Sequence, residues 1–320
     1  MIAVVIPYFQ REPGILANAM RSVFASKGVE DVCVIVVDDA SPVSAESELA
    51  QMGTTRFPVK IIQQPNGGPG AARNTGLENV PDDVDYVAFL DSDDTWSPQH
   101  LHNALVALRA GYDVYFCDLI QLGANISGFQ RAGRIDPTKH STIAGRTDLH
   151  AYQGDMFNQI ITGNIIGTPT VVFDRQKFDS LRFRTDLASA GEDYLFWLEL
   201  SDRGARFAFG STPSVICGKG VNVYAGAGWG TEGHARRIID ELSYRKALLS
   251  LYQLNEPQRV FVEEAIRLLS EGFVADCLHR TAHRKPIVWK LVFAMLKAEP
   301  RTAFRAIKVL VNKAISLAHR

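Results

Sequence analysis

Hydrophobic residues in the first 120 positions of the chain follow two alternating patterns. Continuous apolar runs such as IAVVIPYF, VCVIVVDD, VKIIQQ, DYVAFLD and DVYFCDL are typical of buried strands. Between them lie stretches that predict helices, such as GILANAMRSVFAS, SAESELAQM and GAARNTGLENV. Because strands that are apolar on both faces need cover on both sides, the pattern predicts an α/β fold with a mostly parallel central sheet flanked by helices.

The pattern changes along the rest of the chain. The helix predicted for PQHLHNALVALRAG has Ser97 as its N-cap, Pro98 at its first position and Gly111 just past its end. Over residues 123–170 the periodicity weakens, and we predict loops and short elements that wall a cleft. GEDYLFWLELSDRG then predicts a helix, ARFAFG and SVICGKG predict two short strands, and the chain from Glu232 onward predicts helices alone.

Composition places the chain among ordinary globular proteins, since 46% of its 320 residues are hydrophobic and 22% are charged. Its four cysteines are scattered and form no CxxC pair, which predicts free thiols in a reducing compartment and argues against a zinc site. No run of 18 apolar residues occurs. We therefore expect a soluble protein or one bound to a membrane surface.

The formal net charge of -1 conceals a basic C-terminal end, where ten Lys and Arg accompany one acid, Glu299, between Arg280 and Arg320. In PRTAFRAIKVLVNKAISLAHR a basic and polar stripe from Arg301 to His319 shares one helical face, and apolar residues share the other. With KPIVWKLVFAMLK before it, this segment could lie in the interface of a membrane that contains anionic lipid. The alternative is a packing arm whose basic face is solvated. No interleaved aromatics or known motif favour nucleic acid.

Acidic residues follow two of the predicted strands. Asp38 and Asp39 close one strand, and Asp91, Asp93 and Asp94 follow another. In open parallel sheets ligands bind beyond the carboxyl ends of the strands. Aspartate is also favoured at helix caps and in turns, which suits Asp94, but clustered carboxylates repel one another unless a cation or hydrogen-bond donors offset them. Oxygen ligands of this kind suit Mg²⁺ or Mn²⁺, which would also hold substrate phosphates.

A glycine-rich stretch, QPNGGPGAARNTG, lies between these two acidic groups. Its glycines do not complete GxGxxG, and no GKS or GKT occurs in the chain, so the fingerprints of a nicotinamide dehydrogenase and of a P-loop are both missing. The stretch is either a flexible turn or a place where the backbone approaches a nucleotide closely. In the second case Arg73 could contact a phosphate or a base.

Five segments, VVIPYFQRE, VIVVDDASP, QPNGGPGAARNTGL, VAFLDSDDTW and GEDYLFW, together resemble the inverting family 2 glycosyltransferases of the GT-A fold over about residues 1–220. The segment GVNVYAGAGWGTEGHARRIIDELSYRKALL is similar to bacterial exopolysaccharide glucosyltransferases of the succinoglycan type. The resemblance implies a GT-A domain over residues 1–230, with a nucleotide-binding half (1–120) and an acceptor-binding half (121–230). Residues 231–320 would form a helical region with basic amphipathic, membrane-apposed helices.

The activity that this resemblance implies is transfer of glucose from UDP-glucose to a polyprenyl-diphosphate-linked oligosaccharide in exopolysaccharide biosynthesis. The enzyme would need Mn²⁺ or Mg²⁺ and lie on the cytoplasmic face of the inner membrane as a peripheral protein. One alternative is another UDP-hexose or UDP-N-acetylhexosamine transferase for surface polysaccharide. Another is a non-catalytic protein that binds a sugar nucleotide or a glycan, and a homodimer is also open.

The resemblance also implies roles for individual residues. Asp193, with Glu192 beside it, would be the base that takes the proton of the acceptor hydroxyl, although acids in a first helical turn also complement the helix dipole. Asp93 would bind the metal, with Asp91 near the metal or the ribose. The residues expected around the nucleotide sugar are Pro7, Tyr8, Glu12, Asp38, Asp39, Asn66, Gly70, Arg73, Asp91 and Ser92.

Two residues beyond these motifs carry chemistry of their own. His234 could reach the metal or the diphosphate, although a lone histidine is more often a surface or structural residue. Trp229 could stack on an acceptor sugar, or it could belong to the core.

Overall fold

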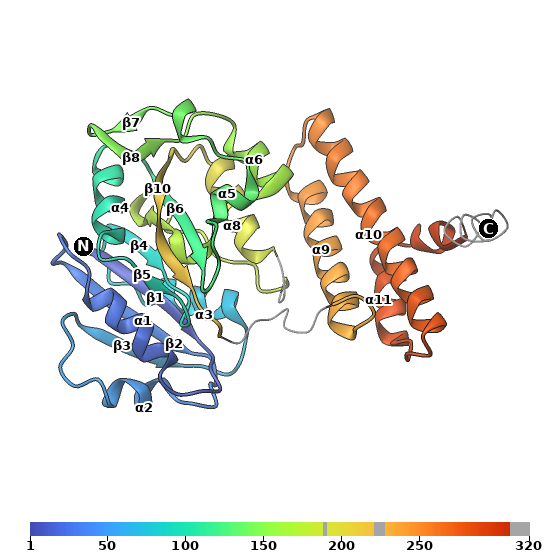
Figure 1. The fold of residues 1–320 in the computed structure, drawn as a ribbon, viewed down its shortest axis with the longest axis horizontal. Coiled ribbons are helices and arrows are strands. Elements are labelled where there is room, and N and C mark those ends of the chain that lie inside the picture. The colour runs from blue at the N-terminus through green and yellow to red at the C-terminus, as the bar shows by residue number, and fades with distance from the viewer. Residues whose placement is uncertain (188–190, 221–227, 308–320) are drawn as a thin grey trace. The chain divides into compact units, whose positions relative to one another are not determined.

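The computed structural model describes residues 1–187, 191–220 and 228–307 of the chain. The chain divides into two compact units (Figure 1). The α/β unit comprises Met1–Thr185 and Asp193–Val221, and the helical unit comprises Asp186–Glu192 and Asn222–Arg320. The part of the predicted basic stripe that follows residue 307, and the segment VNVYAGA, lie outside the described residues.

The α/β unit is built on a ten-stranded sheet with the order β3-β2-β1-β4-β9-β6-β10-β8-β7, and β5 pairs with β10. The strands are β1 Ile2–Tyr8, β2 Val32–Asp38, β3 Val59–Gln63, β4 Tyr86–Phe89, β5 Thr95–Trp96, β6 Val114–Gln121, β7 Thr142–Ile143, β8 Arg146–Ala151, β9 Val172–Asp174 and β10 Phe207–Cys217. The first four strands of the order are parallel, as the apolar runs predict. Beyond them β9 enters antiparallel between β4 and β6, so the whole sheet is mixed.

Helices cover both faces of this sheet. They are α1 Ile15–Phe24, α2 Ala45–Ala50, α3 Pro69–Glu78, α4 His100–Arg109, α5 Gly128–Ala132, α6 Met156–Gly163, α7 Arg175–Phe178 and α8 Glu192–Asp202, with 3₁₀ turns at Pro137–Lys139 and Thr168–Thr170. Even-numbered residues of β1 join one core with α1 and α4. On the opposite face Val5 meets Gly76 of α3, where an added Cβ would lie 2.3 Å from Val5 Cγ1. Glycine thus allows α3 to pack directly on the sheet.

Two predicted boundaries are wrong. Helix α4 begins at His100, with Gln99 as a cap that makes no side-chain bond, and not at Pro98 after a Ser97 cap. The reason is that the chain first forms β5, and the amide of Ser97 donates to the carbonyl of Ser214 at 2.8 Å. The predicted stop is correct, because Gly111 lies just beyond α4 with φ at 92°.

The second wrong boundary concerns the two short strands predicted near residues 205–220. They are one strand, β10, whose register with β6 shifts between Gly210 and Val215. The polar residues of this irregular stretch interrupt the apolar pattern, but the chain keeps its direction in the sheet. The short elements predicted for residues 123–170 are present.

The helical unit contains α9 Glu232–Leu251, α10 Glu256–Ala282, α11 Trp289–Ala298 and a further helical turn over residues 302–307. Thr231 caps α9, and Asn255 forms a capping box with Gln258 at the start of α10. Within the described range, the prediction of helices alone after Glu232 is confirmed. Among the described residues, none of the helices combines the length and the hydrophobicity needed to cross a lipid bilayer.

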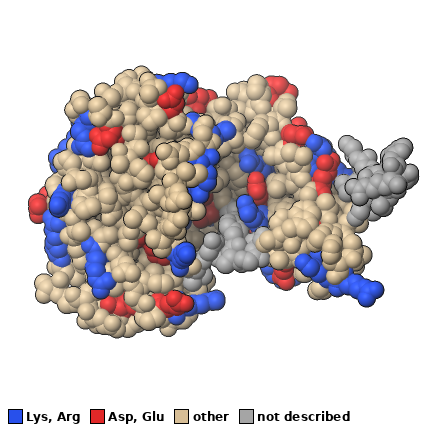
Figure 2. Space-filling view, viewed as in Figure 1, with Lys and Arg blue, Asp and Glu red and all other residues tan. Residues whose placement is uncertain are grey.

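The four cysteines are free, as predicted. Figure 2 shows acidic and basic side chains interspersed on the visible face of each unit.

Candidate active site

An acidic turn, made of Asp91, Ser92, Asp93 and Asp94, follows β4 at the carboxyl edge of the parallel strands. The amide of Leu90 donates to the carbonyl of Val5, and Tyr8 pairs with Asp38, so β1, β2 and β4 end near one another. The amide of Asp94 donates to the carbonyl of Asp91 at 3.0 Å and closes the turn. The predicted strand-end acids therefore meet at one edge of the sheet, where ligands bind in open α/β folds.

The segment after β10 folds onto this acidic turn. The amide of Gly218 donates to Asp94 Oδ1 at 2.8 Å, and the amide of Gly220 donates to Asp93 Oδ2 at 2.7 Å. A Cβ at Gly218 would lie 1.9 Å from the carbonyl oxygen of Asp93, so a larger residue cannot take its place without moving the backbone. The backbone donors partly offset the negative charge of the two carboxylates.

Two carboxylates of the acidic turn, those of Asp93 and Asp94, have raised pKa values. Burial, followed by the charges of Asp91 and Asp93, raises the pKa of Asp94 to about 8. Burial, followed by the charge of Asp91, also raises the pKa of Asp93. A divalent cation would relieve this repulsion, and carboxylate oxygens are the ligands that Mg²⁺ and Mn²⁺ prefer. The described residues hold no group of three or more His, Cys, Asp or Glu arranged for a metal, so a cation here would take its other ligands from substrate phosphates and water.

Asp94 gives the metal-free protein a defined pH dependence. Its pKa in the fold, about 8, lies above the unfolded value of 3.8, so folding favours its protonated form. The resulting stabilisation is complete below the unfolded pKa and is lost as the pH rises through about 8. In the presence of a chelator, we expect the Tm to fall as the pH rises from 3.8 to about 8. Asp94→Asn should remove most of this fall. Circular dichroism measures the Tm. An equal fall of the Tm in wild type and in Asp94→Asn would contradict this assignment.

Arg73 of α3 contacts the acidic turn from the side of the glycine-rich segment. Its Nη2 lies 2.7 Å from Asp91 Oδ1, and its guanidinium lies over the ring of Phe183, 5.3 Å from the centroid. The side chain is buried. Arg73 therefore fixes Asp91 and joins the glycine-rich helix to the acidic turn; its predicted contact with the nucleotide stays a prediction.

Asp39 organises the loop that precedes α3. Its Oδ1 accepts from Gln64 Nε2 at 2.7 Å and from the amide of Gly67 at 2.8 Å, and its Oδ2 accepts from the amide of Gly68 at 2.8 Å. Asn66 Nδ2 donates to the backbone carbonyl of Asp39 at 3.0 Å. The loop and the end of β2 thus form one hydrogen-bonded unit, and the predicted contact of Asp39 with a uracil ring stays a prediction.

Asp38 and the end of β1 complete the surroundings of this loop. Asp38 is buried and accepts from the amides of Ser41 and Ala45, both at 2.8 Å, which ties the end of β2 to the start of α2. The carbonyl of Tyr8 accepts from the amide of Asp39 at 2.9 Å. Burial raises the pKa of Tyr8 to about 12, so its hydroxyl stays protonated at neutral pH.

The remaining predicted nucleotide contacts lie at the same edge. Pro7 is buried within β1, Glu12 is exposed, and Gly70 is buried in the first turn of α3. Ser92 is buried, and its hydroxyl accepts from Gln10 Nε2 at 3.1 Å. That bond links the end of β1 to the acidic turn.

Asp193 lies in the first turn of α8, directly after Glu192. Its Oδ1 accepts from the amide of Tyr194 at 2.8 Å, and Thr168 Oγ1 lies 3.5 Å from its Oδ2. The carbonyl of Pro169, the residue after Thr168, accepts from Nε1 of Trp96 at 2.7 Å. Trp96 itself lies two residues after the acidic turn. The carboxylate of Asp193 is therefore oriented by a segment that is itself bonded to the end of the acidic turn.

Aromatic packing holds α8 against β4. Phe196, one helical turn from Asp193, lies edge-on to Phe89, the last residue of β4, with ring centroids 5.9 Å apart. Phe183 stacks on Phe196 at 4.2 Å and also receives the guanidinium of Arg73. One aromatic cluster thus supports both the predicted base and the arginine that fixes Asp91.

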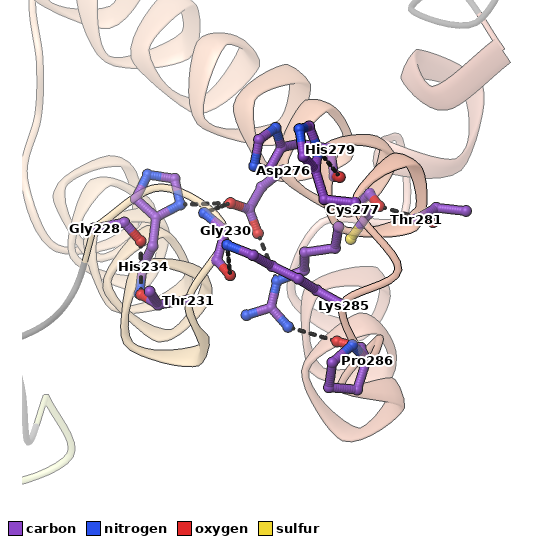
Figure 3. Close-up of polar contacts among 12 residues, drawn as sticks. Gly228, Gly230, Thr231, His234, Asp276, Cys277, His279, Thr281, Lys285 and Pro286 are labelled. Atoms are coloured by element: carbon purple, nitrogen blue, oxygen red, sulfur yellow. Dashed lines mark hydrogen bonds and ion pairs between the residues drawn. The ribbon is translucent and has the colours of Figure 1, made fainter.

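His234 and Trp229 lie in the helical unit. Nδ1 of His234 is 3.1 Å from Asp276 Oδ1, as Figure 3 shows, and the ring of Trp229 lies 5.0 Å from that of His234. The roles predicted for them at a metal and at an acceptor sugar stay predictions.

Sequence reasoning missed several members of this site. Gly218 and Gly220 bind the acidic turn, Thr168 orients Asp193, and Gln10 bonds Ser92. The two glycines did leave a signal, because GKG directly after a strand indicates close backbone approach. Thr168 and Gln10 left none.

Several known proteins are similar to this chain in sequence. A model of the family described as "Glycosyl transferase family 2" matches residues 3–170. "Succinoglycan biosynthesis protein ExoW" of Rhizobium meliloti (strain 1021) is 38% identical over 232 residues, which cover 70% of this chain and 70% of that protein. "Minor teichoic acid biosynthesis protein GgaA" of Bacillus subtilis (strain 168) is 35% identical over 122 residues, which cover 37% of this chain and 25% of that protein.

Solved structures resemble the whole chain in fold. S. aureus TarS (residues 1–349) has a TM-score of 0.58 at 16% identity and covers 96% of this chain and 88% of its own. A mannosyltransferase from Pyrobaculum calidifontis, solved with GDP-Man and Mn²⁺, has a TM-score of 0.58 at 17% identity. It covers 98% of this chain and 86% of its own. At these identities the likeness establishes the fold, which is the GT-A glycosyltransferase fold predicted from the sequence.

Proposed function

Since the chain belongs to glycosyl transferase family 2, we propose that it transfers glucose from UDP-glucose to a polyprenyl-diphosphate-linked oligosaccharide in exopolysaccharide biosynthesis. The observation that carries the proposal is the acidic turn at the carboxyl edge of the sheet, joined by Thr168 and the aromatic cluster to Asp193. The succinoglycan relative supports a role in exopolysaccharide synthesis, and the teichoic acid relative supports a surface polysaccharide more generally.

The reaction is an in-line displacement with inversion. The acceptor oxygen forms a bond to the anomeric carbon of the donor, the bond from that carbon to the diphosphate oxygen breaks, and its electron pair leaves with UDP. Asp193 takes the proton of the acceptor hydroxyl, with its carboxylate oriented by Thr168 and the amide of Tyr194. Asp93, with Asp91 beside it, would hold Mn²⁺ or Mg²⁺, which supplies positive charge against the departing diphosphate.

The donor would bind along the edge formed by β1, β2 and α3. The backbone of the loop over residues 64–68, held by Asp39, would approach the nucleotide, and Pro7, Tyr8 and Glu12 would border the uridine. Arg73 acts on this site by holding Asp91 in place.

Calorimetric titration of UDP and UDP-glucose tests the proposal, first with Mn²⁺ and then with a chelator, using NAD as the control. We expect UDP binding that requires the metal, and no binding of NAD. If UDP fails to bind with metal present, the proposed site is wrong. UDP-galactose and UDP-N-acetylglucosamine in the same titration test the alternative donors, and hydrolysis of the bound donor excludes a non-catalytic binding protein.

The acceptor carries a lipid, and α11 has a surface suited to a membrane. Leu291 and Met295 are buried, whereas Trp289 and Phe293 are 64% and 67% exposed. Lysines 290 and 297 lie on the same helix. Exposed aromatics beside basic residues are typical of helices at a membrane interface. We propose that the enzyme is a peripheral protein on the cytoplasmic face of the inner membrane, and the surface of α11 supports the contact with a membrane.

Replacing both Trp289 and Phe293 with alanine should weaken binding to anionic vesicles by about tenfold or more, because two large apolar side chains no longer enter the interface. Sedimentation with vesicles that contain phosphatidylglycerol measures the bound fraction. Leu251→Ala is the matched control, because this exposed apolar side chain ends α9 and has no basic residue next to it in the sequence. Equal binding by the double variant and by the control would place the membrane contact elsewhere.

A further inference from the structure

An open groove of about 340 Å³ lies in the helical unit between the start of α9 and the middle of α10. Its walls include apolar Ile238, Leu268 and Leu269, together with Trp229, His234 and Glu241. The groove therefore combines an aromatic face, an apolar floor and two polar side chains. Its volume is at the lower end of the range for small-molecule sites.

A buried aspartate, Asp276, contacts His234, one of the residues that line this groove (Figure 3). Asp276 of α10 is 1% exposed, and its Oδ1 accepts from the amide of Gly230 at 2.7 Å and from Nδ1 of His234 at 3.1 Å. Its Oδ2 accepts from Nε of the buried Arg280 at 3.1 Å, and Arg280 Nη1 donates to the carbonyl of Pro286 at 2.8 Å. The turn that carries Trp229 and His234 is thus held by a fully bonded buried ion pair.

Gly230 shows how closely this turn is packed. Its φ is 74°, a conformation that favours glycine, and an added Cβ would lie 2.9 Å from His279 and 3.0 Å from Lys285 Nζ. Thr231 then starts α9 by accepting from the amide of His234 at 3.2 Å. The backbone is therefore constrained between Trp229, directly before this glycine, and His234 in the first turn of α9.

The bond to Asp276 also fixes the chemistry of His234. A neutral imidazole that donates from Nδ1 to a carboxylate leaves Nε2 as an acceptor. Within the described part of the chain, Nε2 makes no hydrogen bond, and the side chain lines the groove. Trp229, 49% exposed, places its ring 5.0 Å from the imidazole. An aromatic face beside an available acceptor suits a ligand that is both apolar and hydroxylated.

We propose that this groove is a saccharide-binding site that holds one pyranose ring of the acceptor. The C–H face of the ring stacks on Trp229 and Leu268, and ring hydroxyls donate to Nε2 of His234 and to the carboxylate of Glu241. A purely hydrocarbon ligand would leave Nε2 of His234 without a partner. Glu241 is ion-paired with Arg245 at 3.6 Å, and its carboxylate can accept from a hydroxyl but repels a phosphate. This inference rests on the proposed function, and it assigns His234 to sugar binding in place of metal binding.

Direct binding is measured by tryptophan fluorescence, because Trp229 and Trp289 are exposed whereas Trp96 and Trp197 are buried. The probe is a pool of soluble glucose and galactose disaccharides, titrated into Trp289→Phe, in which Trp229 is the remaining exposed tryptophan. We expect a saturable change with a Kd on the order of 1 mM. We expect His234→Asn, made in the same background, to weaken binding about tenfold. An asparagine amide retains the donor toward Asp276 but lacks the second nitrogen, so the turn is preserved.

Kinetics separate this site from the donor site. With a soluble acceptor, Trp229→Ala and His234→Asn should raise the acceptor KM about tenfold while hydrolysis of UDP-glucose and affinity for Mn²⁺ stay at wild-type values. Trp289→Ala is the matched control and should leave this KM unchanged. An unchanged KM together with no fluorescence change overturns the proposal, and so does a loss of Mn²⁺ affinity in His234→Asn. If wild type binds the disaccharides but does not hydrolyse UDP-glucose, the saccharide site stands and the proposed function fails.

Discussion

Asp193→Asn should bind UDP-glucose with wild-type affinity and turn over at least about 100-fold more slowly, because general base catalysis contributes that much or more to such reactions. The amide has nearly the shape of the carboxylate. Its Oδ1 can still accept from the backbone of Tyr194, and its Nδ2, which replaces Oδ2, can donate to the hydroxyl of Thr168. What it lacks is the ability to take the proton of the acceptor hydroxyl. The expected result is therefore a loss in kcat without a loss in donor binding.

Release of UDP measured with saturating acceptor gives kcat, and calorimetry gives donor affinity. Asp202→Asn is the matched control, since this exposed aspartate lies at the other end of α8 and should change neither quantity. Glu192→Gln tests whether the neighbouring acid shares the role. Wild-type turnover in Asp193→Asn would remove Asp193 as the base, and an equal loss in Asp202→Asn would indicate damage to α8.

The parts of the fold that the sequence predicts are those determined by local chemistry. Buried strands appear as continuous apolar runs, and the helix end at Gly111 follows from the positive φ that glycine tolerates. The acidic turn was predictable because three aspartates after such a strand have no place in a core. Each of these signals lies within about ten residues of chain, as local patterns require.

The features that sequence reasoning did not predict depend on partners distant in sequence. Helix α4 begins late because Trp96 pairs with Val215. The amides of Gly218 and Gly220, which bond to Asp94 and Asp93, follow those residues by 124 and 127 positions. His234 appeared to be a lone histidine until α10 supplied Asp276, 42 residues later. The periodicity of hydrophobic residues carries no information on such contacts. The sequence therefore predicts the residues of the candidate site and not the hydrogen bonds that connect them.

The second large effect concerns the charge of the acidic turn. We expect Asp93→Asn to weaken metal-dependent binding of UDP about 100-fold. Removal of an outer-shell partner lowers the affinity for a metal roughly 10- to 100-fold, and removal of a direct ligand lowers it further. Asparagine keeps a carbonyl oxygen that can accept from the amide of Gly220, so the segment after β10 should stay in place. The variant therefore removes a charge and not the fold.

The test compares UDP titrations with Mn²⁺ and with chelator in wild type, Asp93→Asn and Asp83→Asn, the last being an exposed aspartate before β4 that serves as control. If Asp93 binds the metal, Asp93→Asn should show the same weak affinity under both conditions. Removing one of three mutually repelling acids should also lower the pKa of Asp94, since the charge of Asp93 contributes to raising it. Asp93→Asn without metal should then lose less stability than wild type as the pH rises toward 8. Undiminished metal-dependent binding would show that Asp91 or Asp94 is the ligand, because those carboxylates remain in the same turn.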